Sequence, residues 1–271
     1  MKISTWNVNG IRARAAEVLQ WIEREQPDVL CLQEIKSPPE SVPEALAALS
    51  DYWSFWHGHK GYSGVSIHLK RATFPGRPRF SHPEFDLETR IVEAKTGDLR
   101  FVSCYVPNGG KDFDAKLRFL EGLERYAGAR HRMILCGDLN VAREERDVHP
   151  KLQKQDQIGT TPIERKLLAQ ILGHGLTDLA RKFAPDDDRL FTWWAPWRNL
   201  KERNIGWRID YVLASEELAA KAVSCASIRE FGTSDHGPTV AVFDVAPPQY
   251  AGEPEPAARP EPVKSGQIPL L

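Results

Sequence analysis

Side chains able to bind metal or move protons follow an apolar run at residues 133–140, Met-Ile-Leu-Cys-Gly-Asp-Leu-Asn. The run is short, contains β-prone residues and stops at Gly137, which predicts a buried strand ending in a turn. Side chains alternate between the two faces of a strand, so we expect Asp138 and Asn140 to point the same way. Taken alone, Gly-Asp and Leu-Asn are equally ordinary turn sequences. The pair therefore gains meaning only if the arrangement recurs.

The same arrangement of polar residues after or before apolar runs does recur along the chain. The other polar strand ends carry Asn7, Glu34, Tyr105, Asp210 and the pair Asp235–His236. Repeated strand ends bearing acids and amides predict strands that converge on one rim, where active sites are commonly built.

The elements that position this rim are strands mixed with helices. Apolar runs predict strands at 2–6, 28–32, 53–59, 64–69, 90–94, 99–105, 133–140, 208–214 and 239–245. Apolar residues at three- and four-residue spacing predict helices at 11–22, around 46–49, at 115–126 and at 162–172. A long polar loop is expected at 142–160.

Composition limits the class of protein. The chain has 271 residues, 41% of them hydrophobic and 27% charged, which predicts a soluble globular protein with a sizeable core. A net charge of −1 gives no global basic field, so a nucleic-acid partner would have to meet local basic groups. The four cysteines have no CxxC spacing, which favours buried, reduced thiols in a cytoplasmic protein. No apolar run approaches the ~18 residues of a membrane span, and we expect no secretory signal.

The composition changes after residue 245. Prolines and glutamates alternate with small residues and aromatic residues stop at Tyr250, so we expect a folded domain at 1–245 and a disordered tail at 246–271. The last residues, Gln267–Leu271, resemble the short peptide with which bacterial proteins bind the sliding clamp. A tail without function is the alternative.

Ordered sequence blocks resemble a known family. The blocks are WNVNGIR at 6–12, LQEIK at 32–36, YVPN at 105–108, GDLN at 137–140, WRIDY at 207–211 and SDHGP at 234–238. In this order they resemble a bacterial exonuclease III-type apurinic/apyrimidinic (AP) endonuclease of the endonuclease/exonuclease/phosphatase superfamily. The resemblance implies an α/β fold: a four-layer α/β sandwich of two packed mixed β-sheets flanked by helices. It also implies metal-assisted hydrolysis of a phosphodiester.

The resemblance assigns the metal site to one part of the rim. Glu34 is implied as the principal ligand of Mg²⁺, with Mn²⁺ as the alternative ion. Asn7 and Asp235 are implied beside it, either as direct ligands or through water. The alternative for Glu34 is a surface acid after a strand, and for Asn7 a turn amide.

The remaining rim residues receive catalytic roles from the same resemblance. Asp138 would orient or deprotonate the attacking water, and Asn140 would hold that water or bind a phosphate oxygen. His236 is the other candidate base or a charged phosphate donor, with Asp210 fixing its tautomer. Tyr105 would donate a hydrogen bond to phosphate, unless it is only a rim aromatic residue.

Tryptophans alternate with basic residues over 191–211. Aromatic walls and cations suit a flipped-out nucleotide whose phosphates need neutralising. By resemblance, a pocket for a base-less sugar is expected to be lined by Trp193, Trp207 and Ile209. The alternative is a tryptophan-rich core segment. Further DNA contacts are expected at Asn108 and Lys111.

The expected function is Mg²⁺-dependent hydrolysis of the phosphodiester 5′ to abasic sites in duplex DNA. Exonuclease activity in the 3′→5′ direction and 3′-phosphatase or phosphodiesterase activity at 3′ ends would accompany it, in a monomer acting on the cytoplasmic nucleoid. One alternative is a phosphatase or phosphodiesterase of the same fold acting on a non-DNA substrate such as a phospholipid. Another is a noncatalytic DNA- or clamp-binding protein. The aromatic and basic segment argues against the first, and the filled catalytic positions argue against the second.

Overall fold

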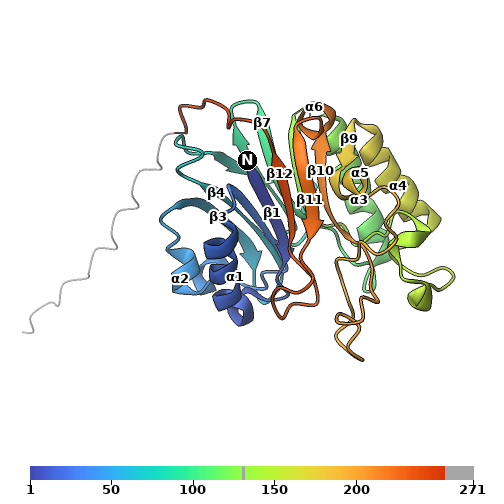
Figure 1. Ribbon diagram of the computed structural model, residues 1–271. Coiled ribbons are helices and arrows are strands. Elements are labelled where there is room, and N and C mark those ends of the chain that lie inside the picture. Colours follow the sequence, from blue (N-terminus) through green and yellow to red (C-terminus); the bar gives the residue numbers. More distant parts are fainter. Residues whose placement is uncertain (130–131, 254–271) are drawn as a thin grey trace, which may run out of the picture.

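The computed structural model describes residues 1–129 and 132–253, which form two β-sheets packed face to face with helices outside them (Figure 1). The first six-stranded sheet has the order β11 (Ala222–Ser227), β12 (Thr239–Phe243), β1 (Lys2–Asn7), β2 (Val29–Gln33), β4 (Tyr62–Lys70) and β3 (Tyr52–His59). The second six-stranded sheet has the order β5 (Arg79–Ser81), β6 (Ile91–Thr96), β7 (Leu99–Tyr105), β8 (Met133–Asp138), β10 (Asp210–Ser215) and β9 (Leu176–Asp178). Both sheets are mixed. The expected four-layer α/β sandwich is confirmed.

Helices cover the outer faces of the two sheets. On one side lie α1 (Ile11–Glu25) and α2 (Glu44–Ala47), and on the other α3 (Phe113–Gly128) and α4 (Pro162–Gly173) (Figure 1). Other short helical pieces are α5 (Leu179–Phe183), α6 (Glu216–Ala219) and the 3₁₀ turns Pro39–Ser41, Glu145–Asp147 and Pro150–Leu152. Helix α4 begins as the sequence predicts, because Thr161 caps it in a reciprocal capping box with Glu164 and Pro162 occupies the first turn.

The main core lies between the two sheets. Ile3 and Cys31 of the first sheet pack in one buried cluster with Phe101, Ile134 and Val212 of the second. Strands that are covered on both faces need apolar residues at nearly every position. This need explains why β2 and β8 appear in the sequence as continuous apolar runs rather than as alternating ones.

The connections bring several strand ends to one edge. Strands β1 and β2 are parallel and are joined through α1, and Asn7 pairs with Gln33 in their register. Strands β7 and β8 are also parallel and are joined through α3, and here Tyr105 pairs with Asp138. Strand β10 runs antiparallel to β8, so Asp210 begins it directly opposite Asp138. The carboxyl ends of β1, β2, β7 and β8 therefore meet the amino end of β10.

Some predicted elements differ from the structure. Strand β8 ends at Asp138 rather than at residue 140, because Asn140 adopts a left-handed backbone with φ of 51°. Strand β10 begins at Asp210 rather than at 208. The prediction missed β5 and β9, which have only three residues each, and β11, in which half of the side chains are exposed. Such strands lack the long apolar run by which a strand is recognised.

The structure bears on the expectations for the cysteines, for a membrane span and for the C-terminal tail. The cysteines are unpaired, and Cys31, Cys104 and Cys136 are buried as expected. Within the described residues, no helix is long and apolar enough to cross a membrane. Residues 246–253 form no helix or strand, although the Glu253 backbone N–H donates to the Arg77 carbonyl at 2.9 Å. The rest of the expected tail, including Gln267–Leu271, lies outside the described residues.

Candidate active site

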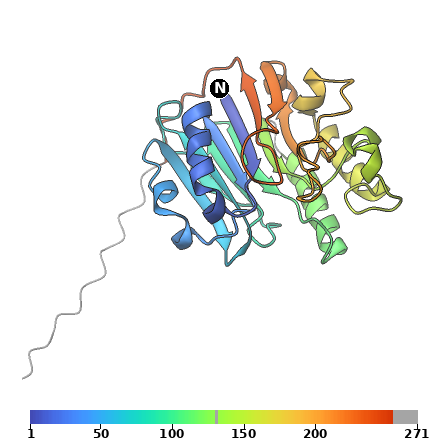
Figure 2. The same ribbon diagram turned by 60° about the horizontal axis from the view of Figure 1, so that its bottom comes forward.

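The strand ends surround a cavity of about 550 Å³ at one edge of the sandwich. Strand β1 runs toward this edge, which lies at the bottom of Figure 1 and is turned toward the reader in Figure 2. Most predicted site residues line the cavity: Glu34, Tyr105, Asn108, Asp138, Asn140, Trp193, Trp207, Ile209, Asp235 and His236. Asn7 and Asp210 lie beneath it in direct contact with its lining residues, and both are buried. The structure thus brings together residues far apart in the sequence.

Glu34 lies on the cavity wall just after β2 and is held on several sides. Its Oε1 accepts a hydrogen bond from the Tyr105 hydroxyl at 2.7 Å and from Asn7 Nδ2 at 3.2 Å, and its Oε2 lies 2.9 Å from Lys36 Nζ. Burial raises the pKa of Glu34, but the Tyr105 hydrogen bond and the Lys36 ammonium outweigh burial, so the net pKa is lowered. The side chain is therefore an ionised carboxylate at neutral pH.

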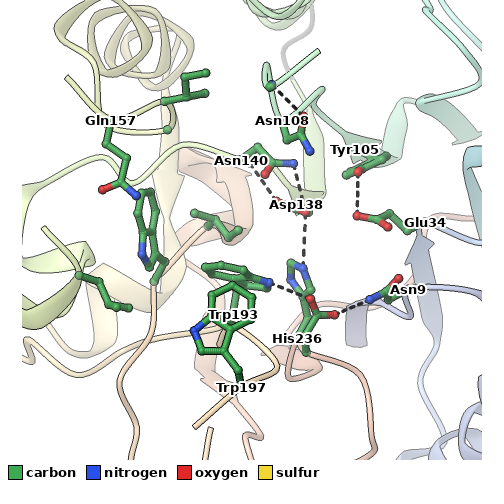
Figure 3. A pocket seen from close by; sticks show the side chains of 18 of the residues that line it. Asn9, Glu34, Tyr105, Asn108, Asp138, Asn140, Gln157, Trp193, Trp197 and His236 are labelled. Carbon is green, nitrogen blue, oxygen red and sulfur yellow. Dashed lines mark hydrogen bonds and ion pairs between the residues drawn. The ribbon is translucent and has the colours of Figure 1, made fainter. Parts of the chain in front are cut away.

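Asp138 and Asn140 form a turn at the end of β8 and are hydrogen-bonded to each other. The Asn140 backbone N–H donates to Asp138 Oδ1 at 2.9 Å, which is a side-chain turn of the kind the sequence allowed. The Asn140 side chain also donates, to Asp138 Oδ2 at 3.3 Å and to the Val106 carbonyl at 2.9 Å. The turn that the sequence allowed is therefore present, and it aims the Asp138 carboxylate at the cavity (Figure 3).

His236 lies between two carboxylates. Its Nδ1 is 2.9 Å from Asp210 Oδ2 and its Nε2 is 3.8 Å from Asp138 Oδ2. Both acids and the histidine are buried, and their ligand atoms all lie within 4.8 Å of one another. Asp210 is fixed from behind, because its backbone N–H donates to Thr192 Oγ1 at 3.0 Å. The imidazole is therefore oriented by Asp210, with Nε2 turned toward Asp138.

His236 and Asp138 differ in the pH at which each gives up its proton. Burial alone would lower the pKa of His236, but the charge and hydrogen bond of Asp210 outweigh burial and raise it to about 10. Burial, together with the charge of Asp210, raises the pKa of Asp138 to about 8, although His236 pulls it down. His236 therefore carries a proton at neutral pH, while Asp138 exchanges a proton near it. The arrangement supplies one charged donor and one acid–base group.

Asp235 reaches the cavity from the loop before β12. Its two oxygens accept from Asn9 Nδ2 and from Trp193 Nε1, each at 2.9 Å. Burial raises the pKa of Asp235, but the His236 charge and these hydrogen bonds lower it overall. Asp235 and Glu34 thus present two ionised carboxylates to one cavity. Ionised carboxylate oxygens are the donors that a hard divalent cation prefers, so these residues could hold one.

Aromatic side chains form the other wall of the cavity (Figure 3). The rings of Trp193 and Trp207 meet edge to face with centroids 6.2 Å apart, and Ile209 packs in the same small cluster as Trp207. Asn108 is exposed at the cavity mouth. Lys111 is exposed too, but it does not line the cavity. The tryptophan-rich segment is therefore divided, since Trp194 is a core residue at 1% exposure while Trp193 faces the site.

Asn9 and Lys36 stand inside the quoted sequence blocks, but no role was predicted for either residue. Lys36 Nζ donates to Asn9 Oδ1 at 2.6 Å, and together the two side chains link Glu34 to Asp235. Left-handed backbones occur at Asn9, Glu34, Lys36 and Asn140, with φ between 45° and 51°. Such conformations are unfavourable for residues other than glycine and tend to gather at functional sites. This signal exists only in the backbone geometry.

A buried ion pair supports the site from below. Lys116 is fully buried, forms an ion pair with Glu164 and donates to the Asn140 carbonyl at 2.7 Å. Glu164 in turn accepts from the Gly159 backbone N–H at 2.8 Å, and Gly159 lies against the Trp207 ring. One pair thus supports both the polar and the aromatic wall.

Comparisons with known proteins agree with this geometry. A model of the Endonuclease/Exonuclease/phosphatase family matches residues 4–236. The DNA repair nuclease APEX1 of Danio rerio is 36% identical over 233 residues, covering 80% of this chain and 74% of that protein. An exodeoxyribonuclease of Bacillus subtilis (strain 168) is 31% identical over 253 residues, covering 90% of this chain and 100% of that protein.

A solved structure gives the same result for the fold. The structure of an AP endonuclease from Archaeoglobus fulgidus matches with a TM-score of 0.81 at 33% identity, covering 90% of this chain and 100% of that one. These matches confirm the resemblance inferred from the sequence blocks. Since the family model matches residues 4–236, which include every rim residue from Asn7 to His236, the chain belongs to the endonuclease/exonuclease/phosphatase family.

Proposed function

We propose that this protein is a DNA repair nuclease that hydrolyses the phosphodiester 5′ to abasic sites in duplex DNA. The observation that supports this most is that one cavity joins the buried Asp138–Asp210–His236 group to an aromatic wall. The Asp138–Asp210–His236 group supplies the charged and acid–base side chains for hydrolysis of a phosphodiester, and the aromatic wall supplies apolar contact for a flipped-out sugar. The products would be a 3′-hydroxyl and a 5′-deoxyribose phosphate.

The proposed roles follow from protonation. Asp138, with its pKa raised to about 8, is the group that accepts the proton of the attacking water, because a base works best when its pKa is near the working pH. Asn140 holds Asp138 and the water in place. His236 stays protonated and stabilises the charge that develops on phosphate, since Asp210 keeps it in its charged form. Tyr105 turns its hydroxyl from Glu34 to a phosphate oxygen when substrate binds.

The donor set supports Mg²⁺ as the cofactor, with Mn²⁺ as the alternative. Glu34 and Asp235 would hold the ion. Asn7 lies beside Glu34 and donates its amide N–H groups to both Glu34 and Asp138, so it would orient these carboxylates and reach the ion directly or through water. When bound, the ion neutralises phosphate charge. The mixture of oxygen donors with no thiolate argues against zinc at this place.

The substrate is proposed from the aromatic wall. Trp193, Trp207 and Ile209 offer apolar contact to a sugar without a base, and such a nucleotide leaves the duplex without breaking a base pair. Asn108 and Lys111 stand at or near the mouth, where strand phosphates would pass. The same pocket would accept a frayed 3′ end, so we propose 3′→5′ exonuclease and 3′-phosphatase or phosphodiesterase activity as well.

A labelled duplex with one abasic-site analogue tests the function. Rapid incision 5′ to the lesion with Mg²⁺, none with chelator, and an intact control duplex left whole are the expected results. Asp138→Asn should lose most turnover and keep DNA affinity, whereas the control Asp98→Asn, at an exposed acid, should be unaffected. Absence of incision together with phosphate release from a phospholipid or inositol phosphate would refute the DNA proposal. DNA binding without any hydrolysis would refute the enzyme.

The remaining proposals concern the whole chain. We propose that residues 1–245 are the catalytic domain, that the protein acts as a cytoplasmic monomer on the nucleoid, and that Gln267–Leu271 bind a sliding clamp. Clamp binding is tested by deleting these last residues and measuring affinity for the clamp of the same organism. Unchanged affinity would refute it.

A further inference from the structure

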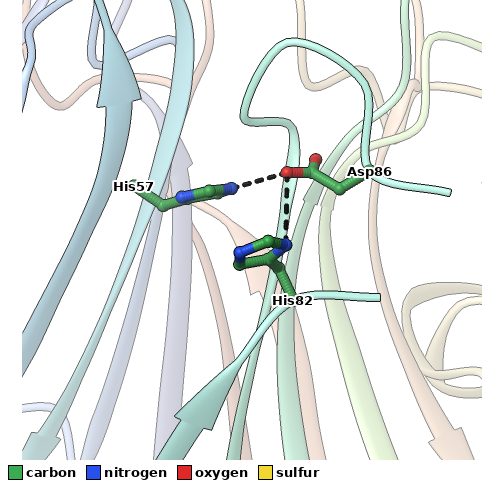
Figure 4. A group of neighbouring side chains, drawn as sticks. All are labelled: His57, His82 and Asp86. Carbon is green, nitrogen blue, oxygen red and sulfur yellow. Dashed lines mark hydrogen bonds and ion pairs between the residues drawn. The ribbon is translucent and has the colours of Figure 1, made fainter. Parts of the chain in front are cut away.

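A second group of metal-ligating side chains lies outside the active site, at the edge of the sandwich (Figure 4). His57 belongs to β3, the edge strand of the first sheet, and His82 follows β5, the edge strand of the second. Asp86 comes from the loop after His82. None of the three lines the active-site cavity, and both histidines point at one carboxylate oxygen.

The distances between the donor atoms suit a single ion. His57 Nε2 is 2.6 Å and His82 Nδ1 is 3.8 Å from Asp86 Oδ2, and all three donor atoms lie within 4.8 Å of one another. A tetrahedral ion with bonds of about 2.0–2.1 Å keeps its ligand atoms about 3.3 Å apart. The two measured separations lie on either side of this value. Small side-chain movements therefore suffice to bring all three atoms onto one ion.

The Asp86 carboxylate is held with one oxygen facing the two histidines. Asp86 Oδ1 accepts the backbone N–H groups of Arg90 at 2.8 Å and Ile91 at 3.1 Å, which leaves Oδ2 to face the imidazoles. The Asp86 side chain is 8% exposed and that of His57 is 15% exposed, whereas that of His82 is 52% exposed. Two ligands are therefore fixed by packing, while the third is free to turn toward an ion entering from solvent.

The two sheets also touch through neighbouring side chains. Phe55 of β3 stacks on Phe80 of β5 with ring centroids 5.3 Å apart, and the rings of His57 and His82 stack at 4.6 Å. An ion bound by His57 and His82 would thus tie together two edge strands that are already in contact. Because the ligands come from different sheets, they are in place only in the folded chain.

We propose that His57, His82 and Asp86 bind one divalent transition-metal ion of the zinc class and thereby brace the edges of the two sheets. Two imidazole nitrogens and one carboxylate oxygen suit Zn²⁺, Co²⁺ or Ni²⁺ better than Mg²⁺, which prefers oxygen donors throughout. The remaining coordination position belongs to water. This site is independent of the proposed nuclease activity, and its role is stabilisation, since an ion that binds only the folded state raises the melting temperature.

Equilibrium dialysis of the full-length, metal-stripped protein against Zn²⁺, with Mg²⁺ in excess throughout, tests the proposal. His82→Asn removes the exposed ligand. His174→Asn is the matched control, because His174 Nε2 also pairs with one carboxylate, Glu124 Oε1 at 2.6 Å, but among the described residues it belongs to no cluster of three possible metal ligands. Wild type and the control should each bind one more Zn²⁺ per chain than His82→Asn. All three proteins share the same active site, so Zn²⁺ bound there cancels from the comparison.

Thermal unfolding gives a second readout. Saturating Zn²⁺ should raise the melting temperature of the wild type and the control by about 5 °C and that of His82→Asn by much less. Asp86→Asn, which keeps an oxygen for the backbone N–H groups, should weaken Zn²⁺ binding by at least about tenfold. Equal Zn²⁺ stoichiometry in wild type and His82→Asn would overturn the proposal, and so would full Zn²⁺ affinity in Asp86→Asn.

Discussion

The Asp210→Asn variant tests how the active site keeps His236 charged. Asp210 Oδ2 lies 2.9 Å from His236 Nδ1, and the pKa of His236 rises from 6.5 to about 10 although burial opposes the charge. A shift of this size corresponds to about 5 kcal/mol in favour of the imidazolium. An asparagine has nearly the same shape but no charge, so the pKa of His236 should fall toward its ordinary value, and the ring should be neutral at pH 8.

Loss of this charge should slow the reaction. Removing one preorganised donor from developing charge costs about 10²–10³ in rate, so single-turnover incision of an abasic duplex at pH 8 should fall by about that factor. The protonation state of the His236 ring is read directly from its ¹⁵N chemical shifts in wild type and variant. Glu124→Gln is the control, because it removes a carboxylate 2.6 Å from another histidine, His174, on the surface. A His236 ring that stays protonated at pH 8 in Asp210→Asn, or incision within about twofold of wild type, would refute the reasoning.

Three further predictions concern stability. Lys116→Met leaves the buried Glu164 carboxylate without its cation and should lower the free energy of unfolding by about 3–5 kcal/mol in urea titrations. The double variant Lys116→Met/Glu164→Gln should recover part of this loss. A loss below about 1 kcal/mol in Lys116→Met would contradict the prediction. Burial lowers the pKa of His68 from 6.5 to about 3. As pH falls from 7 to 5, the His68 side chain therefore takes up a proton only in the unfolded chain, which destabilises the fold. The free energy of unfolding of wild type relative to His68→Gln should fall by about 2 kcal/mol over this pH range. A pH-independent difference would exclude this role for His68. Gly137 has φ of 141°, and a Cβ there would stand 1.9 Å from the Cys104 carbonyl oxygen. Gly137→Ala should therefore lower the free energy of unfolding by more than about 2 kcal/mol. A melting temperature equal to that of wild type would instead show that β7 and β8 can separate.

Local patterns account for what could be predicted of the fold. Strands β2 and β8 are covered on both faces, so their sequences are nearly continuous apolar runs that end in a polar residue. Strand β11 could not be found in this way, because half of its small residues face solvent and its place is set by pairing with β12. The helices were found but their ends moved by a few residues, as for α3, which begins at Phe113 after the cap Asp112.

Only the tertiary structure decided how the site is supported and charged. Lys116 resembles any helical lysine in the sequence, yet it is fully buried against Glu164 because α3 and α4 pack side by side. The raised pKa of Asp138 depends on burial and on Asp210, which is distant in sequence. The grouping of His57 with Asp86 likewise required two sheets to meet at their edges.

The sequence by itself determined which side chains stand at the ends of the central strands, since a continuous apolar run that stops at a polar residue marks where a covered strand ends. It therefore determined the identity of the rim residues and, through the order of the blocks, the family. The tertiary structure decided the distances between them, the protons they hold and the second group at His57. Distances and pKa values depend on through-space contacts and on burial, which are properties of the folded chain rather than of any stretch of its sequence.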